Sequence, residues 1–97
     1  MSQNFENWLY NYIVRDGTQI RERYAKQLIG YLNKLECEEK INLEEEFQKD
    51  ELKTLILKIE NDAQIGKKIK NTAKGDITAV NKFIEFKTGK KIHYNSN

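Results

Sequence analysis

The part of the sequence closest to catalytic chemistry is Asp50-Glu51-x-Lys53, two carboxylates followed by a lysine. Restriction-type nucleases carry these residue types on a β-strand, where the carboxylates hold a metal ion that activates water. In this chain, Leu55 and Ile56 continue the motif at helical spacing rather than with the alternation of a strand. The pattern therefore predicts a surface helix capped by Asp50, and not a metal-dependent catalytic site.

The remaining reactive side chains are one cysteine, Cys37, and one histidine, His93. Cys37 lies among glutamates, whose negative charge disfavours the reactive thiolate, and a lone cysteine excludes an intrachain disulfide. His93 lies in a polar segment that offers neither a nucleophile nor an orienting acid. The sequence also lacks a phosphate loop, a dinucleotide-binding glycine pattern and a calcium loop. We therefore expect no enzyme, no metal site and no cofactor.

Charge is distributed unevenly along the 97 residues, although the net charge is only +2. Residues 1–51 hold seven Lys or Arg and eleven Asp or Glu, whereas residues 52–97 hold ten and four. The acids gather at residues 36–50, which we call the acidic segment, and four lysines gather at residues 67–74. Phosphate suits the lysines, because each lysine–phosphate contact releases a condensed counterion. Further positive charge follows at Lys82, Lys87, Lys90 and Lys91.

A second basic group occupies residues 15–26, near an expected helix start, where positive charge opposes the helix dipole and so indicates an anionic partner. An expected helix start at Lys74-Gly75-Asp76 would add outward N–H groups for an anion, although the Asp76 carboxylate would repel phosphate. The alternative is that both basic groups are ordinary solvated surface charges. Spacing alone leaves open whether they share a face. The expected phosphate contacts are Arg21, Arg23, Lys26, Lys67, Lys68, Lys70 and Lys74.

These charges must be positioned by helices, since the chain has no proline and only five glycines. Apolar residues from Phe5 to Ile13 recur at positions i, i+3, i+4, i+7 and i+8, which form one helical face. We expect this helix to end at Asp16-Gly17, where glycine can adopt a positive φ. A second helix should begin with Thr18 as its cap. Its expected apolar stripe is Ile20, Tyr24, Leu28, Tyr31, Leu32 and Leu35.

Three further segments complete the expected set of helices. Gly30 interrupts the second helix at a cost of about 1 kcal/mol relative to alanine, which predicts a close helix crossing there. Residues 37–49 lack a clear period, so we expect a connection with at most a short helical turn. A third helix should run from about Asp50 to Asn61, with Leu57 outside its buried stripe. That stripe is Leu52, Leu55, Ile56 and Ile59.

The region before the last helix is expected to be a loop or a broken helix spanning residues 62–75. Within it, Ile65 and Ile69 are spaced to anchor one turn on the core. The last helix should start near Gly75 and end before Gly89, which is free to adopt the positive φ of a helix C-terminus. Its expected inward residues are Ile77, Val80, Phe83 and Ile84.

These segments predict an all-α fold, a compact four-to-five-helix bundle that forms one domain from residue 1 to 89. Residues 90–97 should form a polar, frayed tail. No stretch approaches the ~18 apolar residues of a membrane span, and the first residues lack the pattern of a signal peptide. One free cysteine without a signal peptide predicts a reducing, cytoplasmic setting and no membrane partner.

The order of motifs also allows a comparison with known families. The motifs are Phe5-x-x-Trp8-Leu9, Thr18 with Tyr24 and Leu28, Asp62-Ala63-Gln64-Ile65, and Ala79-Val80-x-x-Phe83-Ile84-x-Phe86. This order resembles the SAM-like N-terminal domain of tyrosine recombinases, and more closely a related helical domain of some restriction endonucleases. In those families the domain contacts duplex DNA while a separate domain carries out the chemistry. The families' paired Ser/Thr-x-x-Thr is incomplete here, because only Thr18 is present.

Charge and resemblance together favour a non-catalytic helical module that binds duplex DNA, mainly at phosphates, in a restriction, recombination or other mobile-element system. The alternative is a protein-interaction module, such as a phage-encoded inhibitor of a host defence nuclease. In that case the acidic segment would mimic DNA and occupy a basic groove on the partner. Apolar anchors for such a contact would be Leu57, Phe86 or Tyr10.

Overall fold

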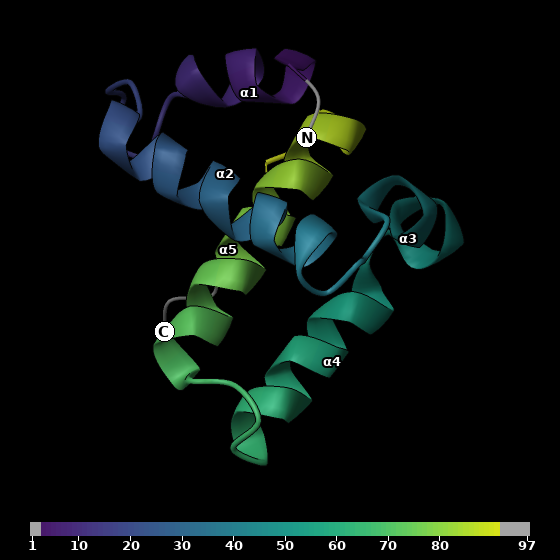
Figure 1. Cartoon of the computed structure of the whole chain (residues 1–97). Coiled ribbons are helices and arrows are strands. Elements are labelled where there is room, and N and C mark those ends of the chain that lie inside the picture. The colour runs from purple at the N-terminus through teal and green to yellow at the C-terminus, as the bar shows by residue number, and fades with distance from the viewer. Residues whose placement is uncertain (1–2, 92–97) are drawn as a thin grey trace.

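The computed structural model describes residues 3–91, and this range is helical with no strand. One isolated antiparallel bridge joins Ile13 to Gln19. The prediction of an all-α bundle of four to five helices is confirmed (Figure 1). No helix in the described range has the length and apolar character of a membrane span. The helices are α1 (Gln3–Tyr10), α2 (Glu22–Cys37), α3 (Leu43–Asp50), α4 (Lys53–Gln64) and α5 (Lys70–Thr88).

Helix α5 is the centre of the bundle, since it packs against α1, α2 and α4, while α3 contacts α4 (Figure 1). At one end of the molecule, Phe5 of α1 lies 5.6 Å from Phe83 and 5.5 Å from Phe86 between ring centroids. Such aromatic pairs stabilise a core beyond the area they bury. The predicted helical face is confirmed for Phe5 and Leu9, but α1 ends at Tyr10, and Ile13, expected on the same face, is 46% exposed. The largest buried apolar residues elsewhere are Leu9, Leu28, Leu32, Leu35, Leu43, Leu52, Ile59 and Val80.

A short hairpin follows α1, where the sequence predicted continued helix. The backbone N–H of Val14 donates to the Thr18 carbonyl at 2.8 Å, and Gly17 adopts a φ of +87° at the turn. The Thr18 hydroxyl donates to Asp16 Oδ1 at 2.6 Å, so it stabilises the turn. The prediction that Thr18 caps the second helix is wrong, because α2 begins four residues later at Glu22.

Helix α2 is rotated relative to the predicted stripe. Ala25 and Ile29 join the buried face, whereas Tyr24 is 43% exposed, contrary to expectation. The predicted close crossing at Gly30 is also wrong, since no neighbouring atom approaches it. A close approach instead occurs at Gly75 on α5, where an added Cβ would lie 2.4 Å from the ring of Tyr31 on α2. Gly75 thus leaves room for the tyrosine ring between α2 and α5.

The acidic connection forms a complete helix, α3, which the sequence analysis missed. The Asn42 side chain accepts the backbone N–H of Glu45 at 3.1 Å, which caps α3 at its first turn. The next helix starts later than predicted, at Lys53, although Asp50 still accepts the backbone N–H of Thr54 at 3.0 Å. The residue at the N-cap position of α4 is Leu52 and not Asp50 as predicted, although the Asp50 side chain still bonds to the first turn of α4 from the end of α3.

Candidate nucleic-acid interface

Helices α4 and α5 meet in a tight turn at one end of the molecule (Figure 1). We call residues 65–74, the turn and the first residues of α5, the α4–α5 tip. The Asp62 carbonyl accepts the backbone N–H groups of Lys67 at 2.8 Å and Lys68 at 3.1 Å, and Gly66 adopts a φ of +82°. These bonds fold the turn back onto the end of α4. The loop or broken helix predicted for residues 62–75 is therefore present as the end of α4, a turn over residues 65–69 and the start of α5.

Helix α5 begins at Lys70, so the helix start predicted near Gly75 is wrong. Asp76 lies inside the helix instead of at its first turn, and it is 1% exposed. Its Oδ2 atom accepts from Lys68 Nζ at 2.7 Å. The carboxylate expected to repel phosphate is therefore buried and offset by a lysine.

Lys68 differs from the other lysines of the tip, because its ammonium faces inward. It also donates to Glu39 Oε2 at 3.0 Å, and its side chain is only 12% exposed. Burial lowers the pKa of Lys68, but the hydrogen bonds to Asp76 and Glu39 outweigh burial, so the pKa is raised overall. Lys68 was expected to contact phosphate. In the structure it ties the tip to α5 and to the end of α2.

The other lysines of the tip point into solvent. Lys67, Lys70 and Lys74 are exposed, and none of the three forms an ion pair within residues 3–91. Lys70 and Lys74 are one helical turn apart and so share a side of α5. The first turn of α5 contains no acidic residue, and no side chain caps it. Its free N–H groups and the three ammonium groups together create positive potential at this end.

The second predicted basic group lies at the start of α2, away from the tip in Figure 1. Arg21 and Arg23 are exposed, and Arg21 is the residue that precedes the first turn of α2. Lys26 is exposed and lies 3.4 Å from the carboxylate of Glu22, one turn earlier. The two basic groups therefore do not form one continuous patch around the helix start of α5.

Much of the acidic segment is neutralised by the chain's own lysines. Lys87 Nζ donates to Glu44 Oε1 at 2.8 Å, and Lys49 lies 3.8 Å from Glu46. Glu45 is exposed and forms no ion pair within residues 3–91. The segment thus offers fewer unpaired charges than its composition suggests.

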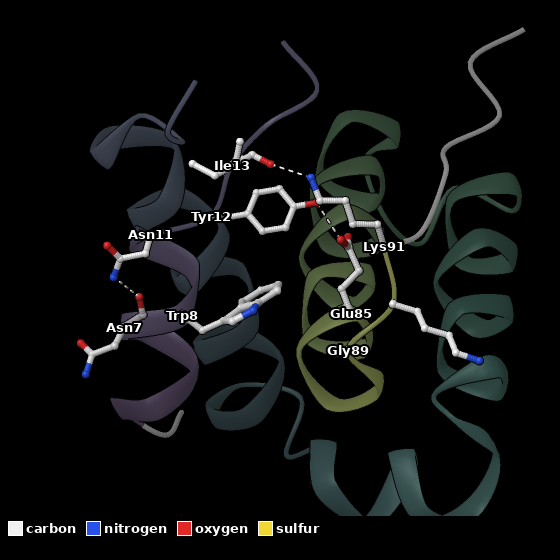
Figure 2. A pocket seen from close by; sticks show the side chains of 9 residues that line it. Asn7, Trp8, Asn11, Tyr12, Ile13, Glu85, Gly89 and Lys91 are labelled. Carbon is white, nitrogen blue, oxygen red and sulfur yellow. Dashed lines mark hydrogen bonds between the residues drawn. The ribbon is translucent and has the colours of Figure 1, made fainter. Parts of the chain in front are cut away.

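An open groove of about 540 Å³ lies between α1, the hairpin and the end of α5 (Figure 2). Among the residues that line it, the Tyr12 hydroxyl donates to Glu85 Oε1 at 2.6 Å. Glu85 Oε2 accepts from Lys82 Nζ at 2.9 Å, although Lys82 is not a lining residue. Lys91 Nζ donates to the Ile13 carbonyl at 2.8 Å. Burial and then the hydrogen bond to Glu85 raise the pKa of Tyr12.

Both carboxylate oxygens of Glu85 are occupied, one by Tyr12 and the other by Lys82. Lys82 is 6% exposed, so its place among the surface lysines was predicted wrongly. The sequence signal that could have found this pair is the i, i+3 spacing of Lys82 and Glu85 on one helix. Their buried bonds fasten the hairpin to α5.

Within residues 3–91, no cluster of three His, Cys, Asp or Glu side chains is arranged to hold a metal ion. Asp50 of the nuclease-like motif bonds to Thr54 in the first turn of α4. Cys37 is exposed. His93 and most of the predicted tail, residues 92–97, lie outside the described residues.

In comparisons with known proteins, no family model, no curated protein and no solved structure matches this chain. The resemblance to recombinase and restriction-endonuclease N-terminal domains is therefore a hypothesis that rests on sequence motifs.

Proposed function

We propose that this chain is a non-catalytic helical module that binds duplex DNA, mainly at phosphates, in a restriction, recombination or other mobile-element system. The observation that carries this proposal is the outward display of Lys67, Lys70 and Lys74 at the acid-free start of α5. Three ammonium groups beside unpaired backbone N–H groups match the phosphates of one strand in charge and in hydrogen-bonding type.

The proposed phosphate contacts are fewer than the seven expected from the sequence. Lys68 is removed from the set, because two carboxylates already occupy its ammonium. Arg21, Arg23 and Lys26 stay in the proposal as a second contact region, which a duplex would meet separately from the tip. Lysine–phosphate contacts position a protein on DNA without reading bases, so we expect weak sequence specificity.

The direct test is a fluorescence-anisotropy titration of a labelled random-sequence duplex. Three phosphate contacts from the tip alone, or six with the second region, predict that log K falls with log salt at a slope of about −3 to −5. Between about 50 and 200 mM salt, affinity should therefore drop by roughly 40-fold or more. Absence of binding at the lower salt concentration would contradict the proposal.

A second candidate is the protein-interaction module, for which the observation is the unpaired, exposed Glu45 on α3 beside the other acids of that helix. Leu57 on α4 is 66% exposed and would serve as its apolar anchor, whereas Phe86 packs against Phe5. A protein that mimics DNA should block cleavage by the nuclease it inhibits. Its activity should disappear when Glu45 is changed to Lys and persist when the tip lysines are changed.

A further inference from the structure

The α4–α5 tip exposes two isoleucines beside its lysines. Ile65 is 56% exposed and Ile69 is 74% exposed, although both were expected to anchor the turn on the core. Burying an isoleucine side chain is ordinarily favourable, so a partner that covered both of them would gain binding free energy. Ile69 immediately precedes Lys70, and Ile65 is separated from Lys67 only by glycine.

The isoleucines are held outward by a braced turn. The Asp62 carbonyl accepts two backbone N–H groups of the turn, at 2.8 and 3.1 Å. Lys68, between the two isoleucines, is anchored inward to Asp76 and Glu39. Because Lys68 is fixed inward, its neighbours on the turn cannot rotate into the core without breaking two ion pairs. Because the turn is already ordered, presenting the two isoleucines to a partner should cost little further conformational entropy.

We propose that Ile69, with Ile65 beside it, inserts as a wedge between stacked base pairs while Lys67 and Lys70 hold the adjacent phosphates. This inference rests on the proposed DNA-binding function and deepens it. Minor-groove proteins use branched aliphatic side chains in this way, and the insertion unstacks one step and bends the duplex. Pyrimidine–purine steps unstack most easily, so the tip should favour sites that contain TA or CA steps.

A lipid surface is the other polyanionic partner that combines charge with apolar contact, but it fits the tip less well. The apolar part of the tip is two aliphatic side chains flanked closely by lysines, without an aromatic residue in residues 65–74. Membrane-surface elements instead present a continuous apolar face that enters the acyl boundary. Leu57, the next exposed aliphatic residue, lies on α4 about two helical turns before the tip.

The test uses a duplex with 2-aminopurine at a central TA step, whose fluorescence rises when the base unstacks. The full chain should raise this fluorescence, and a duplex labelled at both ends should report bending by energy transfer. The double variant I65S/I69S should lose both signals and at least about tenfold in affinity, the contribution expected from burying an isoleucine. Its salt slope should stay unchanged, because the lysines remain.

The control variant is Ile13→Ser, which removes an exposed aliphatic side chain of the hairpin, outside the tip, and should behave as the unaltered chain does. Thermal melting should confirm that both variants fold. Binding without a fluorescence change would overturn the wedge while leaving the DNA-binding function intact. Absence of DNA binding would overturn both. Binding to phosphatidylserine vesicles that I65S/I69S abolishes, with no response from the duplex, would assign the tip to lipid and also overturn the wedge.

Discussion

The α4–α5 tip and the acidic segment are both dense in charge, but they use that charge differently. Three glutamates of the acidic segment, Glu39, Glu44 and Glu46, face lysines of the same chain. At the tip, Lys70 and Lys74 form no ion pair within the described residues and project from the start of α5. The charges available to a partner are therefore those that form no ion pair within the chain. Composition alone does not show which charges these are.

Lys68 connects the two regions, since it belongs to the tip and pairs with Glu39 of the acidic segment. Lys68 thus stabilises the fold through its ion pairs, whereas the neighbouring lysines of the tip are exposed to solvent. The comparison yields a clear rule for this chain: exposed lysines should govern binding, and paired lysines should govern stability.

The largest effect should come from reversing the charge of the displayed lysines. The triple variant K67E/K70E/K74E should lose at least about a hundredfold in duplex affinity at low salt, because attraction to three phosphates becomes repulsion. The matched variant Glu45→Lys in the acidic segment should bind at least as well as the unaltered chain. Anisotropy titrations at one salt concentration compare them. A loss confined to Glu45→Lys would reverse the roles assigned to the two regions.

The second effect concerns stability. Lys68→Ala should lower the free energy of unfolding by about 2 kcal/mol, because it leaves the buried Asp76 without a cation. The value is below that of a fully buried pair, since the Glu39 side chain is 28% exposed. Lys67→Ala, one residue away, should change stability by less than about 0.5 kcal/mol. Urea denaturation measures both changes. Equal effects would contradict the assignment of Lys68 to stability and of Lys67 to binding.

A smaller effect separates single lysines of the two regions. Lys70→Ala should reduce the slope of log K against log salt by about one, the share of a single phosphate contact. Lys49→Ala, which removes the partner of Glu46 in the acidic segment, should leave the slope unchanged. Titrations at four salt concentrations give the slopes. An equal change in the slope for both variants would mean that affinity depends only on the net charge of the chain.

The smallest effect is a dependence on pH. The pKa of Lys68 is raised in the folded chain by Asp76 and Glu39, so the stability it supplies is complete below its unfolded pKa and is lost as pH rises through the folded pKa. The stability difference between the unaltered chain and Lys68→Met should therefore stay constant from about pH 6 to 9 and shrink only above about pH 10.4. Denaturation curves at several pH values check this, and a difference already lost at pH 8 would argue against the ion pair.

The helices with a regular apolar stripe were predictable from the sequence. Phe5 and Leu9 on α1, Leu55 and Ile59 on α4, and Phe83 on α5 lie inward as their spacing indicated. The hairpin was missed because Ile13 continues the helical pattern of α1 by chance, while Asp16 and Thr18 form a turn whose bonds outweigh it.

Two other features were hidden for different reasons. Helix α3 buries only Leu43, so it leaves almost no periodic signal, and its start depends on the Asn42 cap. The first turns of α5 bury Ala73 and Asp76, residue types that do not resemble a core stripe. At the candidate site, the cluster of lysines could be predicted from the sequence. The inward orientation of the Lys68 side chain could not, because it depends on Glu39, which lies 29 residues away. Contacts of that separation leave no local pattern.

The contacts between the N-terminal part of the chain and the end of α5 have a consequence for folding during synthesis. Tyr12 meets Glu85 across 73 residues, and Phe5 packs against Phe83 and Phe86 at the same end. Helix α1 also contacts α2, but its aromatic side chains meet their partners on α5 only after α5 has left the ribosome. At 5–20 residues per second, its aromatic face waits in the nascent chain for roughly 4 to 16 seconds. A chaperone that binds aromatic segments would meet this chain at its first ten residues.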